Sequence, residues 1–156
     1  MKVLVTGADG FIGSNLRVAL GERDGFDVLP ITRGSSDTEL ADAVARADAV
    51  IHLAGVNRPR DPAEFTTGNA DFTARLCGLL AASDRAIPVA FASSIQAERD
   101  NPYGSSKRGA EEHLAAYGSA TGAAVAMYRF ANVFGKWSRP DYNSAVATFC
   151  HNIARG

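Results

Sequence analysis

The stretch TGADGFIG at residues 6–13 follows a short apolar run, VLV, at the start of the chain. Its glycines, Gly7, Gly10 and Gly13, are three residues apart, at the end of an expected strand and the start of an expected helix. Glycine at these places permits a tight turn, close approach of the backbone to a pyrophosphate and close packing of helix on strand. The free N–H groups of the helix N-terminus would favour the anion. Glycine also serves plain strand-to-helix turns, but the pattern downstream favours nucleotide binding.

The rest of the chain alternates apolar runs with helical patterns. We expect strands at residues 3–6, 26–32, 49–54, 87–92 and 123–128, and helices at 12–23, 38–47, 61–83, 102–117 and 144–155. Apolar strands separated by helices are typical of a parallel sheet covered on both faces. The prediction is an α/β fold, a Rossmann-like doubly wound parallel sheet of about five strands with helices on both faces. The second connection has no room for an additional strand, so we expect one edge of the sheet to be trimmed.

Composition indicates one globular domain in a reducing compartment. The chain has 156 residues, 46% of them apolar and 21% charged, with a net charge of −1. This balance gives no electrostatic reason to expect nucleic acid or an anionic membrane as a partner, and no apolar run approaches the ~20 residues that span a bilayer. No signal-peptide pattern opens the chain, and Cys77 and Cys150 lack metal-site spacing. We therefore expect a cytoplasmic protein with no bound metal.

A tyrosine and a lysine four residues apart, Tyr103 and Lys107, share one face of an expected helix. A tyrosine with a pKa near ~10 is a poor acid–base group at neutral pH, and a neighbouring cation lowers that pKa. Ser94 closes the preceding strand, at the edge where open α/β sheets bind ligands. Ser93 competes for the same place. The alternative is a surface tyrosine and lysine on an amphipathic helix.

The glycine turn, the string DAVIHLAG at residues 48–55 and the set Ser94, Tyr103 and Lys107 resemble the extended short-chain dehydrogenase/reductase family of nucleotide-sugar enzymes. The resemblance implies that these three side chains are catalytic. Tyr103 would exchange a proton, Lys107 would bind the nicotinamide ribose and tune the tyrosine, and Ser94 would hydrogen-bond the substrate oxygen. The segment from Ser94 to Tyr103 is shorter than in most of the family, so we expect a loop to be missing and the site to be more open.

The resemblance also implies which residues contact the ligands. Asn132, in the string RFANVFG at residues 129–135, would contact the nucleotide-sugar, with the backbone near Ala131 and Val133 facing the carboxamide. Asn69 would support the architecture of the site. The implied cofactor-binding residues are Gly7, Asp9, Gly10, Phe11, Ile12, Gly13, Arg33, Leu53, Ala54, Gly55, Tyr103 and Lys107.

The residues after the second expected strand bear on the choice of cofactor. A carboxylate there binds the ribose 2′-hydroxyl of NAD, whereas an arginine accommodates the 2′-phosphate of NADP. Arg33 is followed by Ser35, and no carboxylate appears before Asp37. The sequence therefore favours NADP(H), with NAD(H) possible and a solvated arginine as the plain alternative. His52, in the third expected strand, is interpreted as a buried histidine with satisfied hydrogen bonds rather than a catalytic group.

Longer strings resemble a narrower group, the reductases of capsular-polysaccharide and O-antigen precursor synthesis. They are HLAGVNRP at 52–59, SSIQA at 93–97, DNPYGSSK at 100–107, NVFGKWSRP at 132–140 and NSAVATFCHNIARG at 143–156. The resemblance implies NADPH-dependent reduction of the 4-keto group of a UDP-2-acetamido-2,6-dideoxy-hexosulose. It also implies a UDP-sugar substrate and a homodimer paired through the helices at 61–83 and 102–117. Taken by themselves, Cys150 and His151 indicate only a helix, and we do not interpret them as a metal site or a nucleophile pair.

Two other functions stay open at this point. One is an epimerase or dehydratase of the same family with tightly held NAD, and the other is a cofactor-binding domain without turnover. Members of the family extend beyond the motifs found here, so we expect residues 1–156 to be a dinucleotide-binding domain from the N-terminal part of a longer enzyme. The substrate-binding and cupin parts would then lie outside it.

Overall fold

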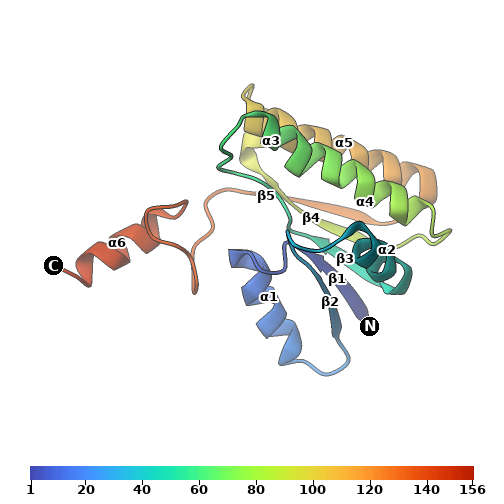
Figure 1. Cartoon of the computed structure of the whole chain (residues 1–156), viewed down its shortest axis with the longest axis horizontal. Coiled ribbons are helices and arrows are strands. Elements are labelled where there is room, and N and C mark those ends of the chain that lie inside the picture. Colours follow the sequence, from blue (N-terminus) through green and yellow to red (C-terminus); the bar gives the residue numbers. More distant parts are fainter.

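In the computed structural model, which describes residues 1–156, five parallel strands form one sheet in the order β2-β1-β3-β4-β5 (Figure 1). The strands are β1 (Lys2–Thr6), β2 (Asp27–Ile31), β3 (Ala49–His52), β4 (Val89–Ser94) and β5 (Val125–Phe130). The main helices are α1 (Phe11–Gly21), α2 (Asp37–Arg46), α4 (Phe72–Ala81), α5 (Pro102–Thr121) and α6 (Ala145–Ile153). The predicted doubly wound parallel sheet is confirmed, and β2 is the trimmed edge.

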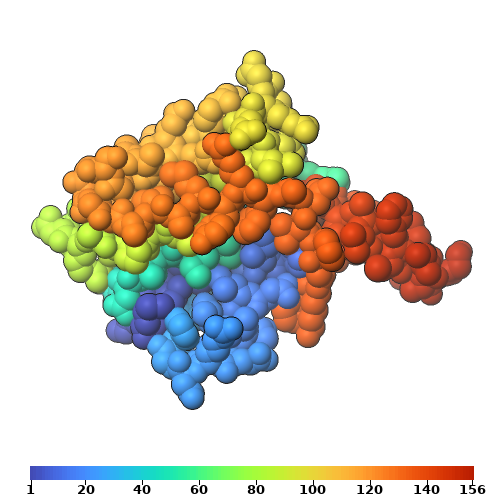
Figure 2. All heavy atoms as spheres, turned by 180° about the vertical axis from the view of Figure 1, so that it is seen from behind, coloured from blue at the N-terminus to red at the C-terminus, as the bar shows by residue number.

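Helices cover both faces of the sheet, but unequally. The larger buried cluster joins Leu4, Leu40, Leu76, Phe91 and Leu114, from β1, α2, α4, β4 and α5. A smaller cluster on the other face packs α1 against the strands in the middle of the sheet. Every residue of β5 after the first is exposed, and the view from behind shows this part of the chain on the surface with α6 projecting beside it (Figure 2).

The helix predicted at residues 61–83 is divided into three parts. A short turn, α3 (Ala63–Phe65), leads into a π-helical segment, η1 (Thr66–Asp71), and then into α4. A Cβ at Gly68 would lie 2.4 Å from the Val56 side chain, so the segment passes close to the loop after β3. The wider π turn places Asn69 under that loop, as π segments often do at functional sites.

The ends of α5 are set by local chemistry. The Asn101 side chain accepts a hydrogen bond from the Gly104 N–H at 2.8 Å, and Pro102 occupies the first helical position. The helix continues to Thr121, beyond the predicted end at 117, because the first left-handed residue is Gly122, with φ of 72°. Tyr103 and Lys107 therefore lie in the first two turns of a long helix. No helix of the chain has the length and apolar character needed to cross a bilayer.

Candidate active site

The glycine turn lies between β1 and α1, and its glycines are required sterically. Gly7 has a φ of +67°, and a Cβ there would lie 2.8 Å from the Ala54 backbone nitrogen. A Cβ at Gly13 would lie 2.2 Å from the Gly7 carbonyl oxygen. Gly10 caps α1 without a side chain, so the N–H groups of the first helical turn remain available to a ligand.

A cavity of about 780 Å³ opens in front of this turn. Of the predicted cofactor residues it is lined by Gly7, Asp9, Gly10, Phe11, Arg33, Leu53, Ala54 and Gly55. Gly13 is buried beneath the turn and acts through the packing of α1 on β1 rather than by lining the cavity. Residues directly after β1, β2 and β3 line this cavity. It therefore lies at the carboxyl ends of these strands, the edge at which open parallel sheets bind ligands.

A smaller cavity of about 200 Å³ adjoins it, with Phe11, Leu53 and Gly55 common to both. The structure brings the three predicted catalytic side chains together here. Its lining includes Ser94, Tyr103, Lys107, Ile12 and Asn132. The glycine turn and the Ser–Tyr–Lys set thus belong to one continuous site.

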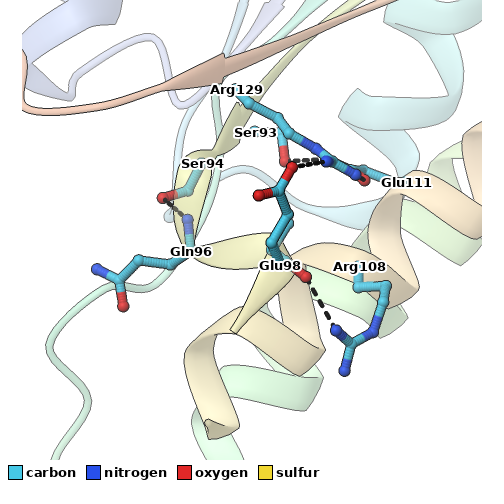
Figure 3. A network of polar contacts seen from close by, with 8 residues as sticks. Ser93, Ser94, Gln96, Glu98, Arg108, Glu111 and Arg129 are labelled. Carbon is cyan, nitrogen blue, oxygen red and sulfur yellow. Dashed lines mark hydrogen bonds and ion pairs between the residues drawn. The ribbon is translucent and has the colours of Figure 1, made fainter. Parts of the chain in front are cut away.

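Ser93 and Ser94 differ in what their hydroxyls do, although both line the smaller cavity. The Ser93 hydroxyl donates to the Glu111 carboxylate at 2.5 Å. The Ser94 hydroxyl accepts from the Gln96 N–H at 3.2 Å, and the two side chains leave the strand in different directions (Figure 3). The Ser94 side chain also acts to lower the pKa of Tyr103. The Ser93 hydroxyl is therefore engaged by Glu111, which leaves Ser94 as the better candidate for a contact with a ligand in this cavity.

Lys107 is almost fully buried, with 5% of its surface exposed. Its Nζ donates to the Ala92 carbonyl at 3.1 Å and lies 4.9 Å from the centre of the Phe91 ring. Burial lowers the pKa of Lys107 to about 8, and the Glu111 carboxylate opposes this shift. One N–H of the ammonium is thus used internally, which leaves the others for a ligand.

Tyr103 differs from the expectation based on its spacing to Lys107. Burial raises the pKa of Tyr103 above its ordinary value, and the interaction that opposes this rise comes from Ser94 rather than from the lysine. The physical reason is that the ammonium of Lys107 is directed at the Ala92 carbonyl and the Phe91 ring. In this state the phenol is a protonated group, suited to donating a proton.

His52 is fully buried and lies at the centre of a directed hydrogen-bond chain. Thr73 donates its hydroxyl proton to the Asn69 carbonyl at 2.7 Å, so its oxygen accepts from His52 Nε2 at 2.9 Å. His52 Nδ1 then accepts from the Thr6 hydroxyl at 2.6 Å. Burial, with the nearby charge of Lys107, lowers the pKa of His52 to about 3. The imidazole is neutral and has both nitrogens occupied, as expected of a structural histidine.

Asn69 joins the loop after β3 to α5. Its Oδ1 accepts from the Val56 N–H at 2.8 Å, and its Nδ2 donates to the Val56 carbonyl at 3.0 Å and to the Ser106 hydroxyl at 2.9 Å. A Cβ at Gly55 would lie 2.8 Å from Asn69 Oδ1 and 3.1 Å from Lys107 Nζ. The side chain thus fixes the backbone that separates the two cavities.

Three functional candidates were missed by sequence reasoning. Arg75, on α4, lines the larger cavity together with Arg33 and Ser35, and it pairs with Asp37. Glu111 and Arg129 form a polar network behind Ser93 (Figure 3). The sequence does not reveal these roles, because the partners come from other elements: Arg75 on α4 pairs with Asp37 on α2, and Glu111 on α5 meets Ser93 on β4 and Arg129 on β5. Cys77 is buried, with its pKa raised to about 11 by burial, and Cys150 is exposed.

A parallel sheet with a glycine turn on the larger cavity and a Ser–Tyr–Lys set on the adjoining smaller one defines a nucleotide-binding fold of the doubly wound class. The sequence pattern of the NAD dependent epimerase/dehydratase family matches residues 3–156, and the chain belongs to this family.

Three individual proteins show which members of the family this chain is similar to. The chain is 57% identical over 155 residues to the UDP-2-acetamido-2,6-beta-L-arabino-hexul-4-ose reductase of Pseudomonas aeruginosa, covering 99% of this chain and 42% of the relative. The crystal structure of the capsular polysaccharide assembling protein CapF from Staphylococcus aureus superposes with a TM-score of 0.87 at 41% identity, over 99% of this chain and 42% of that one. RMD from Pseudomonas aeruginosa, complexed with NADPH, gives 0.80 at 27% identity, over 99% and 62%. The chain spans less than half the length of the first two relatives.

Proposed function

We propose that this chain carries the cofactor site and catalytic side chains of an NADPH-dependent reductase in surface-polysaccharide precursor synthesis. The substrate would be a UDP-2-acetamido-2,6-dideoxy-hexosulose, reduced at its 4-keto group. The observation that carries the proposal is the placement of Ser94, Tyr103 and Lys107 on a cavity continuous with the glycine turn. The identity to the Pseudomonas aeruginosa reductase supports this choice of substrate.

The residues present fit a dinucleotide. Side chains at Gly7 or Gly13 would collide with backbone, so the turn keeps open the space that a pyrophosphate needs against the start of α1. Arg33 and Ser35, which follow β2, also line the larger cavity, where they would hold a 2′-phosphate. We therefore favour NADP(H) over NAD(H) as the cofactor.

The chemistry needs a hydride and a proton. When bound, NADPH supplies the hydride that reaches carbon 4 of the sugar. Tyr103, kept protonated by its raised pKa, donates the proton to the oxygen on that carbon, and the Ser94 hydroxyl hydrogen-bonds the same oxygen. Lys107, with a pKa of about 8, is mostly protonated at neutral pH. Its remaining N–H groups would hold the nicotinamide ribose.

The proposal extends to partners and compartment. Asn132 lines the smaller cavity and would contact the UDP-sugar. α4 and α5 lie side by side on one face of the sheet (Figure 1), and we propose that they pair two copies of the protein in a homodimer. Both cysteines are free thiols, which favours the cytoplasm.

The test is Tyr103→Phe in the full-length protein, with NADPH oxidation measured in the presence of the UDP-4-keto sugar. Loss of the proton donor is expected to lower kcat by about 10²–10⁴-fold. Tyr128→Phe, at an exposed tyrosine of β5, is the matched control and should keep full activity. Turnover of Tyr103→Phe near the wild-type rate contradicts the mechanism.

The same assay separates the other functions of the family. An epimerase or dehydratase with held NAD would convert the sugar without net consumption of NADPH. A cofactor-binding domain without turnover would bind NADPH and leave the sugar unchanged. Either result overturns the reductase proposal.

A further inference from the structure

Glu111 is a buried carboxylate behind the catalytic side chains. It lies on α5 one turn beyond Lys107, and only 7% of the residue is exposed. Its Oε1 accepts from the Ser93 hydroxyl at 2.5 Å and from Arg129 Nε at 2.9 Å, and its Oε2 accepts from a second Arg129 nitrogen at 2.6 Å. The carboxylate therefore joins α5 to β4 and β5 at the point where Ser94 ends its strand (Figure 3).

The network continues around Ser94. Arg129 also donates to the Glu98 carboxylate at 2.8 Å, at the end of the 3-10 turn η2 (Ile95–Glu98) that follows Ser94 directly. From α5, Arg108 donates to the Ala97 carbonyl in the same turn at 2.9 Å. Ser94 is thus held on its N-terminal side through Ser93 and on its C-terminal side through η2.

A carboxylate that is only 7% exposed carries a desolvation cost that an apolar side chain at the same place would avoid, although its partner Arg129 stays 41% exposed. Its position relative to the reacting groups gives a reason for it. Glu111 lies on the same inward side of α5 as Lys107. It accepts a hydrogen bond from Ser93, the residue that directly precedes Ser94. Within this network, Glu111 is the side chain of α5 that hydrogen-bonds residues of both β4 and β5.

We propose that Glu111, bound to Ser93 and Arg129, is a positioning residue of the reductase reaction, which holds Ser94 in place against Tyr103. This inference rests on the proposed function, because it assigns Glu111 to the same chemistry. Glu111 touches neither substrate nor cofactor in it and acts only through its neighbours.

The charge of Glu111 also acts on the pKa of Lys107, in a defined direction. Hydrogen bonds from Arg129 are the main cause that lowers the pKa of Glu111, so the carboxylate is ionised at neutral pH. Its charge raises the pKa of Lys107 against burial. The other groups near the lysine are Tyr103 on the same helix and the neutral His52 on β3. Removal of the carboxylate charge is therefore expected to lower the pKa of Lys107 below about 8.

The experiment compares Glu111→Gln with Glu112→Gln in the full-length protein, by kcat and KM for NADPH-dependent reduction across pH 6 to 10. Glu112 is the matched control, since it is the next residue of α5 and is exposed. For Glu111→Gln we expect kcat to fall about 10-fold at pH 8, with KM for the UDP-sugar within about 2-fold. The alkaline fall in kcat should move to lower pH by about half a unit to one unit. Glu112→Gln should keep the wild-type profile.

Ser93→Ala separates the two effects, because it removes the hydrogen bond and leaves the charge of Glu111 in place. We expect a several-fold lower kcat with an unshifted alkaline limb, and a melting temperature lowered by a few degrees in a protein that still folds. This variant also decides the positioning role if Glu111→Gln does not fold, and a wild-type kcat for Ser93→Ala then overturns it.

Two further outcomes refute the inference. One is a Glu111→Gln profile equal to that of Glu112→Gln. The other is a loss of kcat that matches the loss of folded protein, with the alkaline limb unmoved. A failure of the proposed function looks different, because Tyr103→Phe would then retain turnover whatever the Glu111 variants do.

Discussion

Lowering the pH from 6.5 to 4.5 is expected to destabilise the protein through His52. The imidazole is fully buried, its Nδ1 accepts from Thr6 and its Nε2 donates to Thr73. Protonation would place a second N–H against the Thr6 hydroxyl, whose oxygen already accepts from the backbone N–H groups of Leu53 and Ala54. The folded protein therefore resists protonation, and the pKa of His52 is about 3.

The sign and size follow from linkage. The pKa of His52 is lower in the folded protein than the ordinary 6.5, so between these values the unfolded chain binds a proton that the folded one does not. Stability is therefore lost as the pH falls below 6.5, and the loss continues until the folded group titrates. For one such group the free energy of unfolding falls by about 2 kcal/mol between pH 6.5 and 4.5, with a limiting slope of about 1.4 kcal/mol per pH unit.

Urea unfolding at pH 6.5, 5.5 and 4.5 measures this effect by comparing the wild type with His52→Gln. The variant should be less stable at pH 6.5, because it loses the stacking of the ring on Phe91 at 5.1 Å. Its free energy of unfolding should nevertheless fall by about 2 kcal/mol less than that of the wild type over the same range. His113→Gln, at an exposed histidine of α5, should keep the wild-type dependence. Equal pH dependence in the wild type and His52→Gln would refute the reasoning.

Three other outcomes are expected. Gly13→Ala places a Cβ 2.2 Å from a backbone oxygen of the turn and should weaken NADPH binding at least about 10-fold in a fluorescence titration, whereas Gly21→Ala, with nothing within 4 Å, should not. Arg33→Ala should weaken NADPH binding by about 10-fold, or ~1.4 kcal/mol, and leave NADH binding unchanged; equal effects on both would contradict the 2′-phosphate assignment. A thiol reagent should label Cys150 in the folded protein and spare Cys77, which is buried with a pKa of about 11; labelling at equal rates would contradict that burial.

The parts of the fold that depend on neighbouring residues could be predicted from the sequence. The strands are continuous apolar runs and the glycine turn has its own spacing, so both are readable locally. The same holds for the start of α5, where Asn101 and Pro102 supply the cap and the first helical residue. Five strands, their parallel arrangement and the trimmed edge at β2 follow from such local signals.

The π-helical segment could not be predicted, because its cause lies elsewhere in the chain. Residues 61–83 have an ordinary helical pattern, and nothing in them shows that Asn69 bonds both backbone groups of Val56. The π-helical turn is stabilised by contacts between Asn69 and the loop at Val56, 13 residues earlier in the chain. Spacing rules based on 3.6 residues per turn assume a uniform helix, and they fail where a tertiary contact stabilises a wider turn.

The choice between Ser93 and Ser94 shows the same limit within the site. Neighbours in a strand point to opposite faces, so one of the two hydroxyls had to be turned from the substrate, but periodicity does not say which. Glu111, 18 residues later, takes the Ser93 hydroxyl, and Arg129, 18 residues beyond that, orients the carboxylate. A residue whose partners come from β4 and β5 has no local signature on α5. If positioning of Ser94 depends on this carboxylate, sequence motifs that stop at Lys107 omit a functional part of the same helix.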